Sequence, residues 1–406
     1  MKPISSHRKM LSLLGPAFVA AVAYVDPGNF AANFSAGAQY GYLLLWVLVA
    51  ANLMASLVQY LSAKVGLVTG QSLPEVIASK LSRKTRIAYW MQAEVVAIST
   101  DIAEVIGGAI ALQLLFGLPL VAGGVVTGIV SMLLLWIYSR RGQRYFERII
   151  IGLLLIIPLG FFTGLVMSPP NVGDIAAGLV PRLDGTETVL LAVAMLGATV
   201  MPHVVYLHSA LARDRHGKAE KQKLHGLLKA TRVDVGIAMV VAGSVNIAML
   251  VLAASSLRGL PGVDTLAGIF TALNGNISSL VGFLFALALL VSGFASTAVG
   301  SHAGAVIMEG MIRKRISPFL RRFIVIIPAI ILLICQVEPT QALIISQVAL
   351  SFGIPFALIP LAMVTANKAI MGEAVNKRLT TLAISAIAAI VVLLNFVLIG
   401  LTFFGE

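Results

Sequence analysis

The stretch Asp26-Pro27-Gly28-Asn29 interrupts an apolar run that extends over residues 11–38. Proline lacks an N–H donor, glycine is conformationally loose, and Asp and Asn side chains compete for backbone hydrogen bonds. Together these residues predict that a helix unwinds in the middle of the run. The apolar run of residues 189–212 contains a second interruption, GATVMPH at residues 197–203, which also includes a proline. We therefore predict two broken helices.

The composition around these interruptions is that of a membrane protein. Of the 406 residues, 59% are hydrophobic and 11% are charged, whereas a soluble domain carries about 25% charged residues. Such a chain cannot cover a globular surface with polar groups, which excludes a soluble or a disordered protein. The net charge of +12 comes from basic residues in short loops, so it indicates no nucleic-acid partner. The single cysteine, Cys335, excludes an intrachain disulfide and is expected to be buried in an apolar run.

About eleven apolar segments are candidates to cross a bilayer, for which a helix needs about 20 residues, and the ninth of them is short. The expected spans are residues 11–38, 41–63, 87–113, 118–138, 149–168, 189–212, 233–257, 278–308, 323–338, 340–366 and 379–404. The pattern predicts an all-α integral membrane protein in which residues 1–406 form a single transmembrane domain.

Lysine and arginine residues collect on one side of this topology. All except Arg182 and Arg258 fall at the N-terminus or in loops that follow even-numbered spans. Because such residues are enriched in cytoplasmic loops, the alternation predicts a cytoplasmic N-terminus and an external C-terminus.

The two broken helices are spans one and six, so they cross the membrane in opposite directions. This predicts an inverted repeat, with residues 11–168 as helices 1–5, residues 189–366 as helices 6–10, and residues 379–404 as an additional helix 11. Inverted-repeat transporters bind substrate at the midplane between broken helices, where freed carbonyls and half-helix ends coordinate ions. Irregular backbone at that depth must line a cavity, which favours a binding site over two ordinary proline kinks.

These motifs resemble those of the Nramp family of proton-coupled divalent-metal transporters, especially its bacterial manganese-transport branch. The family motif DPGN corresponds to residues 26–29, and the motif MPH to residues 201–203. The strings TDIAE at residues 100–104 and SQVALSFGIPFALIPL at residues 346–361 are similar as well. The resemblance covers spans one to ten and implies a LeuT-type 5+5 inverted repeat with broken helices 1 and 6.

Three side chains at the interruptions have the chemistry of metal ligands. Asp26 offers an anionic oxygen whose burial in a membrane is costly, Asn29 offers a carbonyl oxygen, and Met201 offers a thioether sulfur. Ca²⁺ and Mg²⁺ take oxygen ligands almost exclusively, whereas Mn²⁺, Fe²⁺, Co²⁺ and Cd²⁺ tolerate sulfur. Met201 is therefore expected to discriminate against Ca²⁺ and Mg²⁺ more than it adds affinity.

The resemblance implies three further metal ligands. These are the backbone carbonyls of Ala23 and Ala198 in the unwound stretches, and the side chain of Gln347 on span ten. An interhelical hydrogen bond remains the alternative role for Gln347.

Span three carries Glu94, Asp101 and Glu104 at spacings that place them on one helical face. Three acids are too costly to expose to lipid, so they are expected to face a cavity or basic partners. Arg321 and Arg322, at the start of span nine, are candidate partners. The residues alone predict a polar network, which could be purely structural. The resemblance implies that the network is a proton pathway from the metal site to the cytoplasm.

The same resemblance adds Asp26 and two histidines to the proton pathway. His203 is implied to tune proton coupling without binding metal, and His208 is expected to line the inner pathway. A hydrogen-bonded packing role is the alternative for both histidines. Asn52 and Asn246 are expected to support the gates, because family members have polar residues there.

We therefore expect proton-coupled import of Mn²⁺, and of Fe²⁺, Co²⁺ and Cd²⁺, through the inner (plasma) membrane by alternating access. The expected partners are the metal ion, H⁺ and the lipid bilayer, with no cofactor, nucleic acid or obligatory protein partner. No nucleotide-binding or hydrolase motif occurs, so no enzyme is expected. A passive cation channel, an inverted-repeat transporter of an amino acid or another small cation, and a metal sensor are the alternatives. Asp26 disfavours a substrate carboxylate, and the lack of an appended soluble domain disfavours a sensor.

Overall fold

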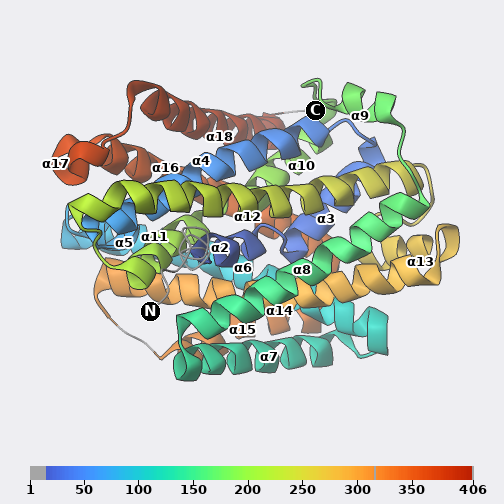
Figure 1. Cartoon of the computed structure of the whole chain (residues 1–406). Coiled ribbons are helices and arrows are strands. Elements are labelled where there is room, and N and C mark those ends of the chain that lie inside the picture. The colour runs from blue at the N-terminus through green and yellow to red at the C-terminus, as the bar shows by residue number, and fades with distance from the viewer. Residues whose placement is uncertain (1–14, 315–316, 405–406) are drawn as a thin grey trace, which may run out of the picture.

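A computed structural model of the protein describes residues 15–314 and 317–404, and within these ranges the chain is helical and contains no β-strand (Figure 1). The first half contains α2 (Pro16–Ala23), α3 (Pro27–Tyr40), α4 (Leu45–Thr69), α5 (Leu73–Ala78), α6 (Arg83–Phe116), α7 (Leu120–Arg141), α8 (Gln143–Met167) and α9 (Val172–Gly178). The second half contains α10 (Gly185–Thr199), α11 (Pro202–His216), α12 (Lys221–Ser256), α13 (Leu266–Asn276), α14 (Ser279–Ile312), α15 (Pro318–Ile334), α16 (Pro339–Ala366), α17 (Lys368–Met371), the 3-10 turn η1 (Gly372–Ala374) and α18 (Arg378–Phe404).

The helices are those of a multi-pass membrane protein. Nine helical segments of the described chain are long and apolar enough to cross a membrane, with α10 and α11 counted as one. The first predicted span is divided into α2 and α3, and the ninth corresponds to α15, which has 17 residues. Residues 11–14, with which the first predicted span begins, and both chain ends lie outside the described residues.

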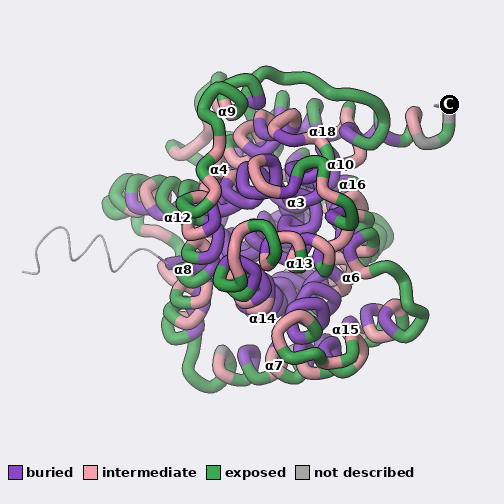
Figure 2. The backbone as a smooth tube through the Cα atoms, turned by 90° about the vertical axis from the view of Figure 1, so that its right-hand side faces the viewer, coloured by how far each residue is buried: buried purple, intermediate pink, exposed green. Residues whose placement is uncertain are grey.

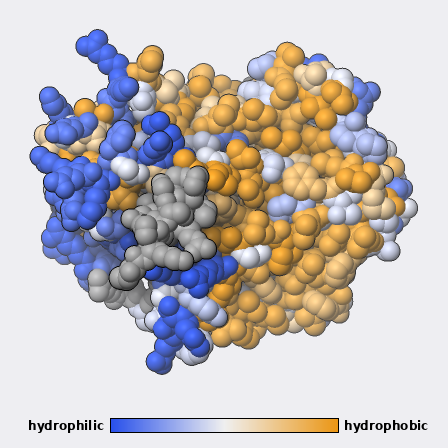
Figure 3. Space-filling model, in the orientation of Figure 1, coloured by the Kyte–Doolittle hydropathy of each residue, from blue (hydrophilic) through white to orange (hydrophobic). Residues whose placement is uncertain are grey.

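The surface divides into a hydrophobic belt and a hydrophilic end. Figure 3 shows hydrophilic residues gathered at the end of the bundle where Figure 1 places α5 and α17, whereas α9 and α13 lie at the opposite end. Large apolar side chains such as Ile129 on α7, Leu159 on α8 and Val240 on α12 are exposed. An exposed apolar belt of this extent is expected where lipid surrounds the protein.

The broken helices occupy the centre of the bundle. Viewed from the α13 end, α3, α10 and α14 are mostly buried, while exposed residues lie on the periphery (Figure 2). α3 packs on α12, α10 on α16, α11 on α4, and α14 on α6. The two interruptions are therefore enclosed by the long helices α4, α6, α12, α14 and α16.

Cys335 is exposed, and the prediction that it is buried was wrong. α15 ends at Ile334, and the chain then turns through Gln336, whose φ is 55°. Cys335 therefore caps a helix that ends before the apolar run of residues 323–338 does.

Gly197 marks a close approach of α10 to α16. A Cβ at this position would lie 1.9 Å from the backbone oxygen of Gln347. We expect Gly197→Ala to lower the midpoint of thermal unfolding in detergent, at a cost of about 1–3 kcal/mol. Alanine has the better helix propensity by about 1 kcal/mol, so propensity alone predicts the opposite sign.

Gly152→Ala on α8 is the matched control, because a Cβ there would meet no atom within 4 Å. We expect this control to leave the midpoint unchanged or to raise it. Equal changes in the two variants would contradict the packing argument.

Candidate metal-binding site

Each interruption frees a backbone carbonyl. Pro27 begins α3 and Pro202 begins α11, and neither proline has an N–H to donate to the carbonyl four residues earlier. Those carbonyls belong to Ala23, the last residue of α2, and to Ala198, the penultimate residue of α10. The C-terminal end of a helix carries partial negative charge, so both half-helices end in groups that favour a cation.

Asp26 and Asn29 join the two interruptions. Asp26 is the N-cap of α3, and its Oδ1 accepts hydrogen bonds from the backbone N and from the side-chain Nδ2 of Asn29, both at 2.8 Å. The same Nδ2 donates to the freed carbonyl of Ala198 at 3.0 Å. A carboxylate, an amide and a carbonyl from the other broken helix therefore form one buried cluster.

Gln347 completes this cluster from α16. Its Nε2 lies 3.5 Å from Oδ2 of Asp26, and a Cβ on the adjacent Gly28 would lie 1.8 Å from that nitrogen. Among the described residues, Oδ1 of Asn29 and Oε1 of Gln347 are buried without a hydrogen-bond partner. Buried acceptors without partners are costly. A cation beside the Asp26 carboxylate would satisfy both oxygens once the Asn29 amide turns Oδ1 toward it.

Met201 adds a sulfur atom at the second interruption. It is the N-cap residue of α11, has φ −61° and ψ 115°, and is completely buried. The six predicted ligand residues come from α2, α3, the α10–α11 interruption and α16, and each is at most 1% exposed. A set of carboxylate, amide, carbonyl and thioether groups is suited to a divalent transition metal.

Side chains from two neighbouring helices hold the unwound backbone after α2. Nδ2 of Asn246 on α12 donates to the Tyr24 carbonyl at 2.7 Å, and its Oδ1 accepts from Nδ2 of Asn33 at 2.9 Å. The hydroxyl of Ser292 on α14 donates to the Val25 carbonyl. Asn33 and Ser292 were missed in the sequence, where a lone polar residue in an apolar helix is the only signal.

Asn52, the other predicted gate residue, lies on α4 away from these hydrogen bonds. Its side chain faces α12, where a Cβ on Gly243 would lie 2.2 Å from Nδ2. Its Oδ1 is buried, and no residue in the described part of the chain donates to it. Asn52 therefore packs between helices in this conformation.

The acids of α6 meet the arginines of α15. Nη2 of Arg321 lies 2.8 Å from Oε1 of Glu94, and its Nη1 lies 3.8 Å from Oδ2 of Asp101. Nη1 of Arg322 pairs with Oδ1 of Asp101, and its Nε donates to the Ser131 hydroxyl on α7 at 2.7 Å. The two helices thus share a buried network of charges.

Glu104 lies between this network and the interrupted helix. It is 1% exposed, and its carboxylate faces α14, where a Cβ on Gly300 would lie 2.9 Å from Oε1. It has no ion pair within residues 15–314 and 317–404, unlike Asp101 one turn earlier. One turn later, a Cβ on Gly107 would lie 2.0 Å from Cβ of Pro27. α6 therefore connects the candidate metal site to the arginines.

The two histidines join separate hydrogen-bond chains. Nδ1 of His203 lies 3.3 Å from the Thr100 hydroxyl on α6, and its buried Nε2 has no partner in the described chain. Nδ1 of His208 lies 2.7 Å from Oε1 of Gln59 on α4, and Nε2 of Gln59 donates to the Tyr24 hydroxyl. The sequence analysis missed Thr100, Gln59 and Tyr24 as members of these hydrogen-bond chains. Nothing local in the sequence shows which polar residues of different helices lie next to each other.

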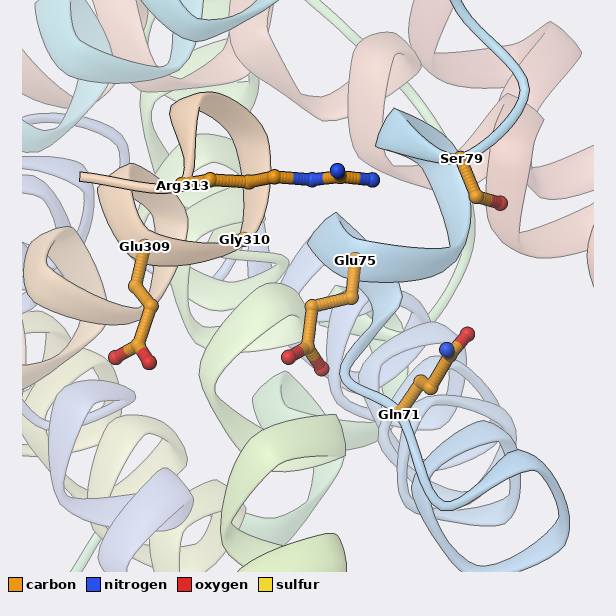
Figure 4. A pocket seen from close by; sticks show the side chains of 6 residues that line it. All are labelled: Gln71, Glu75, Ser79, Glu309, Gly310 and Arg313. Atoms are coloured by element: carbon orange, nitrogen blue, oxygen red, sulfur yellow. The ribbon is translucent and has the colours of Figure 1, made fainter.

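The end of the bundle with α5 and α17 has a cavity of about 400 Å³ between α5 and α14, which is lined by Gln71, Glu75, Ser79, Glu309, Gly310 and Arg313. Figure 4 shows Arg313 extending from α14 toward α5. Burial acts to raise the pKa of Glu75, but hydrogen bonds from Ser72 and the charge of Arg213 outweigh it and hold this pKa below its ordinary value. Glu75 is thus ionised at neutral pH and fastens α5 to α11.

A sequence model of the family described as "Natural resistance-associated macrophage protein-like" (Nramp) matches residues 17–401. The chain belongs to the Nramp family. Among curated relatives, the "Divalent metal cation transporter MntH" of Mycobacterium tuberculosis is 55% identical over 394 residues, covering 97% of this chain and 92% of the relative. This Nramp chain is therefore a membrane transporter and not an enzyme.

Solved structures agree with this membership. The Eremococcus coleocola manganese transporter, in complex with an aromatic bis-isothiourea substituted compound, matches with a TM-score of 0.88 and 31% identity, covering 100% of this chain and 90% of that chain. MhsT in complex with L-phenylalanine matches in fold alone, with a TM-score of 0.61 and 14% identity over 94% of this chain and 98% of that chain. The predicted LeuT-type fold with two broken helices is confirmed.

Proposed function

We propose that this Nramp protein imports divalent transition-metal ions, chiefly Mn²⁺ and Fe²⁺ and also Co²⁺ and Cd²⁺, by proton-coupled alternating access. The observation that carries the proposal is the buried cluster in which Asp26, Asn29 and the Ala198 carbonyl join both interruptions. Relatives over nearly the full chain are named divalent metal cation transporters. The predicted inverted repeats, residues 11–168 and 189–366, would rock around this cluster.

The charges at the cluster favour a cation over an anionic substrate. Asp26 is a carboxylate, and α2 and α10 both present the negative ends of their helix dipoles. A substrate carboxylate would be repelled by all three groups, which disfavours an amino acid.

Burial of the cluster favours a carrier over a passive channel. The six proposed ligand residues are each at most 1% exposed, so the site is closed from both ends of the bundle in this conformation. An open channel needs a continuous path for ions, whereas a carrier passes through closed states.

The buried acids and histidines supply a route for the coupled proton. In our proposal a proton passes from Asp26 by way of His203 and Glu104 to the Asp101–Arg322 pair and on to the cytoplasm. The basic end of the bundle then faces the cytoplasm and the protein lies in the inner membrane, where the membrane potential draws cations inward with about 2.3 kcal/mol per charge per 100 mV.

Uptake of Mn²⁺ into proteoliposomes, with and without an inward proton gradient, tests the proposal. We expect uptake that saturates, that accelerates with the gradient, and that persists in excess Mg²⁺. Linear uptake indifferent to the gradient would instead indicate a channel, and complete competition by Mg²⁺ would refute transition-metal selectivity.

Met201→Ala tests the role of the thioether. Because sulfur is a poor ligand for hard cations, we expect Mn²⁺ uptake to fall by less than about tenfold while Ca²⁺ or Mg²⁺ becomes an effective competitor. Competition assays with each of the two ions measure the change. Met195→Ala, at a buried position on α10 outside the cluster, is the matched control. An unchanged selectivity in Met201→Ala would remove the thioether from the explanation.

A further inference from the structure

We propose that the outer end of this Nramp protein holds a second, weaker cation site, a hydrated antechamber that collects divalent cations above the buried site. The inference rests on the proposed function. A cavity of about 500 Å³ opens between the beginnings of α10 and α16, the C-terminal half of α3 and the residues before α13. Its polar lining consists of Ser35, Gln39, Glu187, Asp264, Glu338 and Gln341, together with Thr265.

The antechamber is aligned with the buried cluster, because α3, α10 and α16 contribute to both. Ser35 on α3 lines the cavity and lies six residues from Asn29, which is roughly 9 Å along a helix. Ile344 on α16 also lines it and lies three residues from Gln347, which is roughly 4.5 Å. The floor of the cavity is therefore one to two helical turns from the proposed ligands.

The charge of the antechamber is opposite to that of the protein as a whole. The chain has a net charge of +12, yet Glu187, Asp264 and Glu338 are exposed at this mouth, and no described Lys or Arg lines it. The two arginines of this end, Arg182 and Arg258, line a neighbouring cavity that also contains Asp174 and Asp184. A concave mouth lined by one sign of charge concentrates ions of the opposite sign.

Ser35 provides an independent indication of a ligand. Its side chain is completely buried at the cavity lining, and its Oγ has no hydrogen-bond partner within the described ranges. A buried hydroxyl without a partner is costly, so a polar occupant of the cavity stabilises it. A water molecule of a hydrated cation supplies the missing donor or acceptor.

The carboxylates hold such an ion through its water shell. No group of three or more His, Cys, Asp or Glu residues in the described chain is arranged to hold a metal ion directly. Glu338 also accepts hydrogen bonds from the backbone N of Thr340 and of Gln341. The antechamber therefore accepts divalent cations as a class, Mg²⁺ and Ca²⁺ included, and leaves selection to the buried cluster.

Kinetics of the double variant Glu187→Gln/Asp264→Asn test the antechamber. Both residues are exposed, so the fold tolerates the change. We expect the KM for Mn²⁺ to rise about fivefold or more at 10 mM ionic strength, with Vmax changed less than twofold. The increase should disappear near 1 M salt, where charges are screened within about 3 Å.

Asp174→Asn/Asp184→Asn is the matched control for this experiment. It removes two charges from the same end of the protein, but both residues line the neighbouring cavity with the arginines. We expect its KM to stay within twofold of the wild type. A Glu187→Gln/Asp264→Asn variant that behaves like this control at low salt would overturn the proposal.

Direct binding separates the antechamber from transport. In full-length Asp26→Ala protein in detergent, electron paramagnetic resonance should detect weak Mn²⁺ binding that Mg²⁺ competes away. Adding Glu187→Gln and Asp264→Asn should abolish this binding. Binding that survives these substitutions, or no binding in Asp26→Ala, would refute the antechamber. Absence of wild-type Mn²⁺ uptake would refute the proposed function, and the titration would still decide the antechamber.

Discussion

Asp26→Asn should reduce the initial rate of Mn²⁺ uptake at least about 100-fold, which corresponds to about 2.7 kcal/mol of lost stabilisation. Asp26 is the only carboxylate in the buried cluster, where it contacts Asn29 and Gln347. The substitution keeps the size of the side chain and removes its charge. A divalent ion would then meet only neutral ligands in a low-dielectric interior, where charge compensation matters most.

Uptake into proteoliposomes at equal protein density measures this effect. Asp174→Asn, at an outer cavity remote from the cluster, is the matched loss of one carboxylate and should transport normally. Equal midpoints of thermal unfolding in detergent would show that both variants fold. Uptake by Asp26→Asn within about threefold of the wild type would remove Asp26 as the central ligand.

Arg322→Met should have the largest effect on stability, a loss of about 3–5 kcal/mol. Arg322 is completely buried, pairs with Asp101, and donates to the Ser131 hydroxyl. Without it, Asp101 remains buried, and its nearest remaining basic atom is Nη1 of Arg321 at 3.8 Å. A buried carboxylate that has lost its partner is strongly unfavourable.

The midpoint of thermal unfolding in detergent measures the loss of stability. A second variant tests whether the loss comes from the unpaired Asp101 carboxylate. Arg322→Met/Asp101→Leu removes both charges and should recover part of the stability, because no unpaired carboxylate remains. Arg140→Met, at an exposed position at the end of α7, should change stability by less than about 0.5 kcal/mol. A double variant less stable than Arg322→Met would contradict the pairing argument.

The same variants address the proposed proton route. If the Asp101–Arg322 pair carries the coupled proton, the stable double variant should still take up Mn²⁺, but an inward proton gradient should no longer accelerate uptake. Full acceleration by the gradient would assign the pair a structural role only.

The sequence by itself determined the membrane-spanning character of the helices and the two breaks, and it predicted their sidedness. Apolar runs report helix length because a bilayer has a fixed thickness, and basic residues report sidedness because they are retained in cytoplasmic loops. The two helix breaks can also be predicted from local sequence, because Pro27 and Pro202 each lack a backbone N–H donor whatever surrounds them. The 17-residue α15 is also where the sequence was least informative, because its apolar run extends into the turn at Cys335.

Only the tertiary structure decided which polar groups meet. Asn29 and the Ala198 carbonyl are 169 residues apart, and Gln347 and Asp26 are 321 residues apart. Helical periodicity shows which residues share a face, but it does not specify which faces of different helices pack together. Helix packing also creates the hydrogen-bond chain from Tyr24 through Gln59 to His208. It creates the outer cavity above the cluster as well. Their physical basis is the packing of helices that are distant in sequence, because buried polar groups become satisfied or orphaned only when those helices come together.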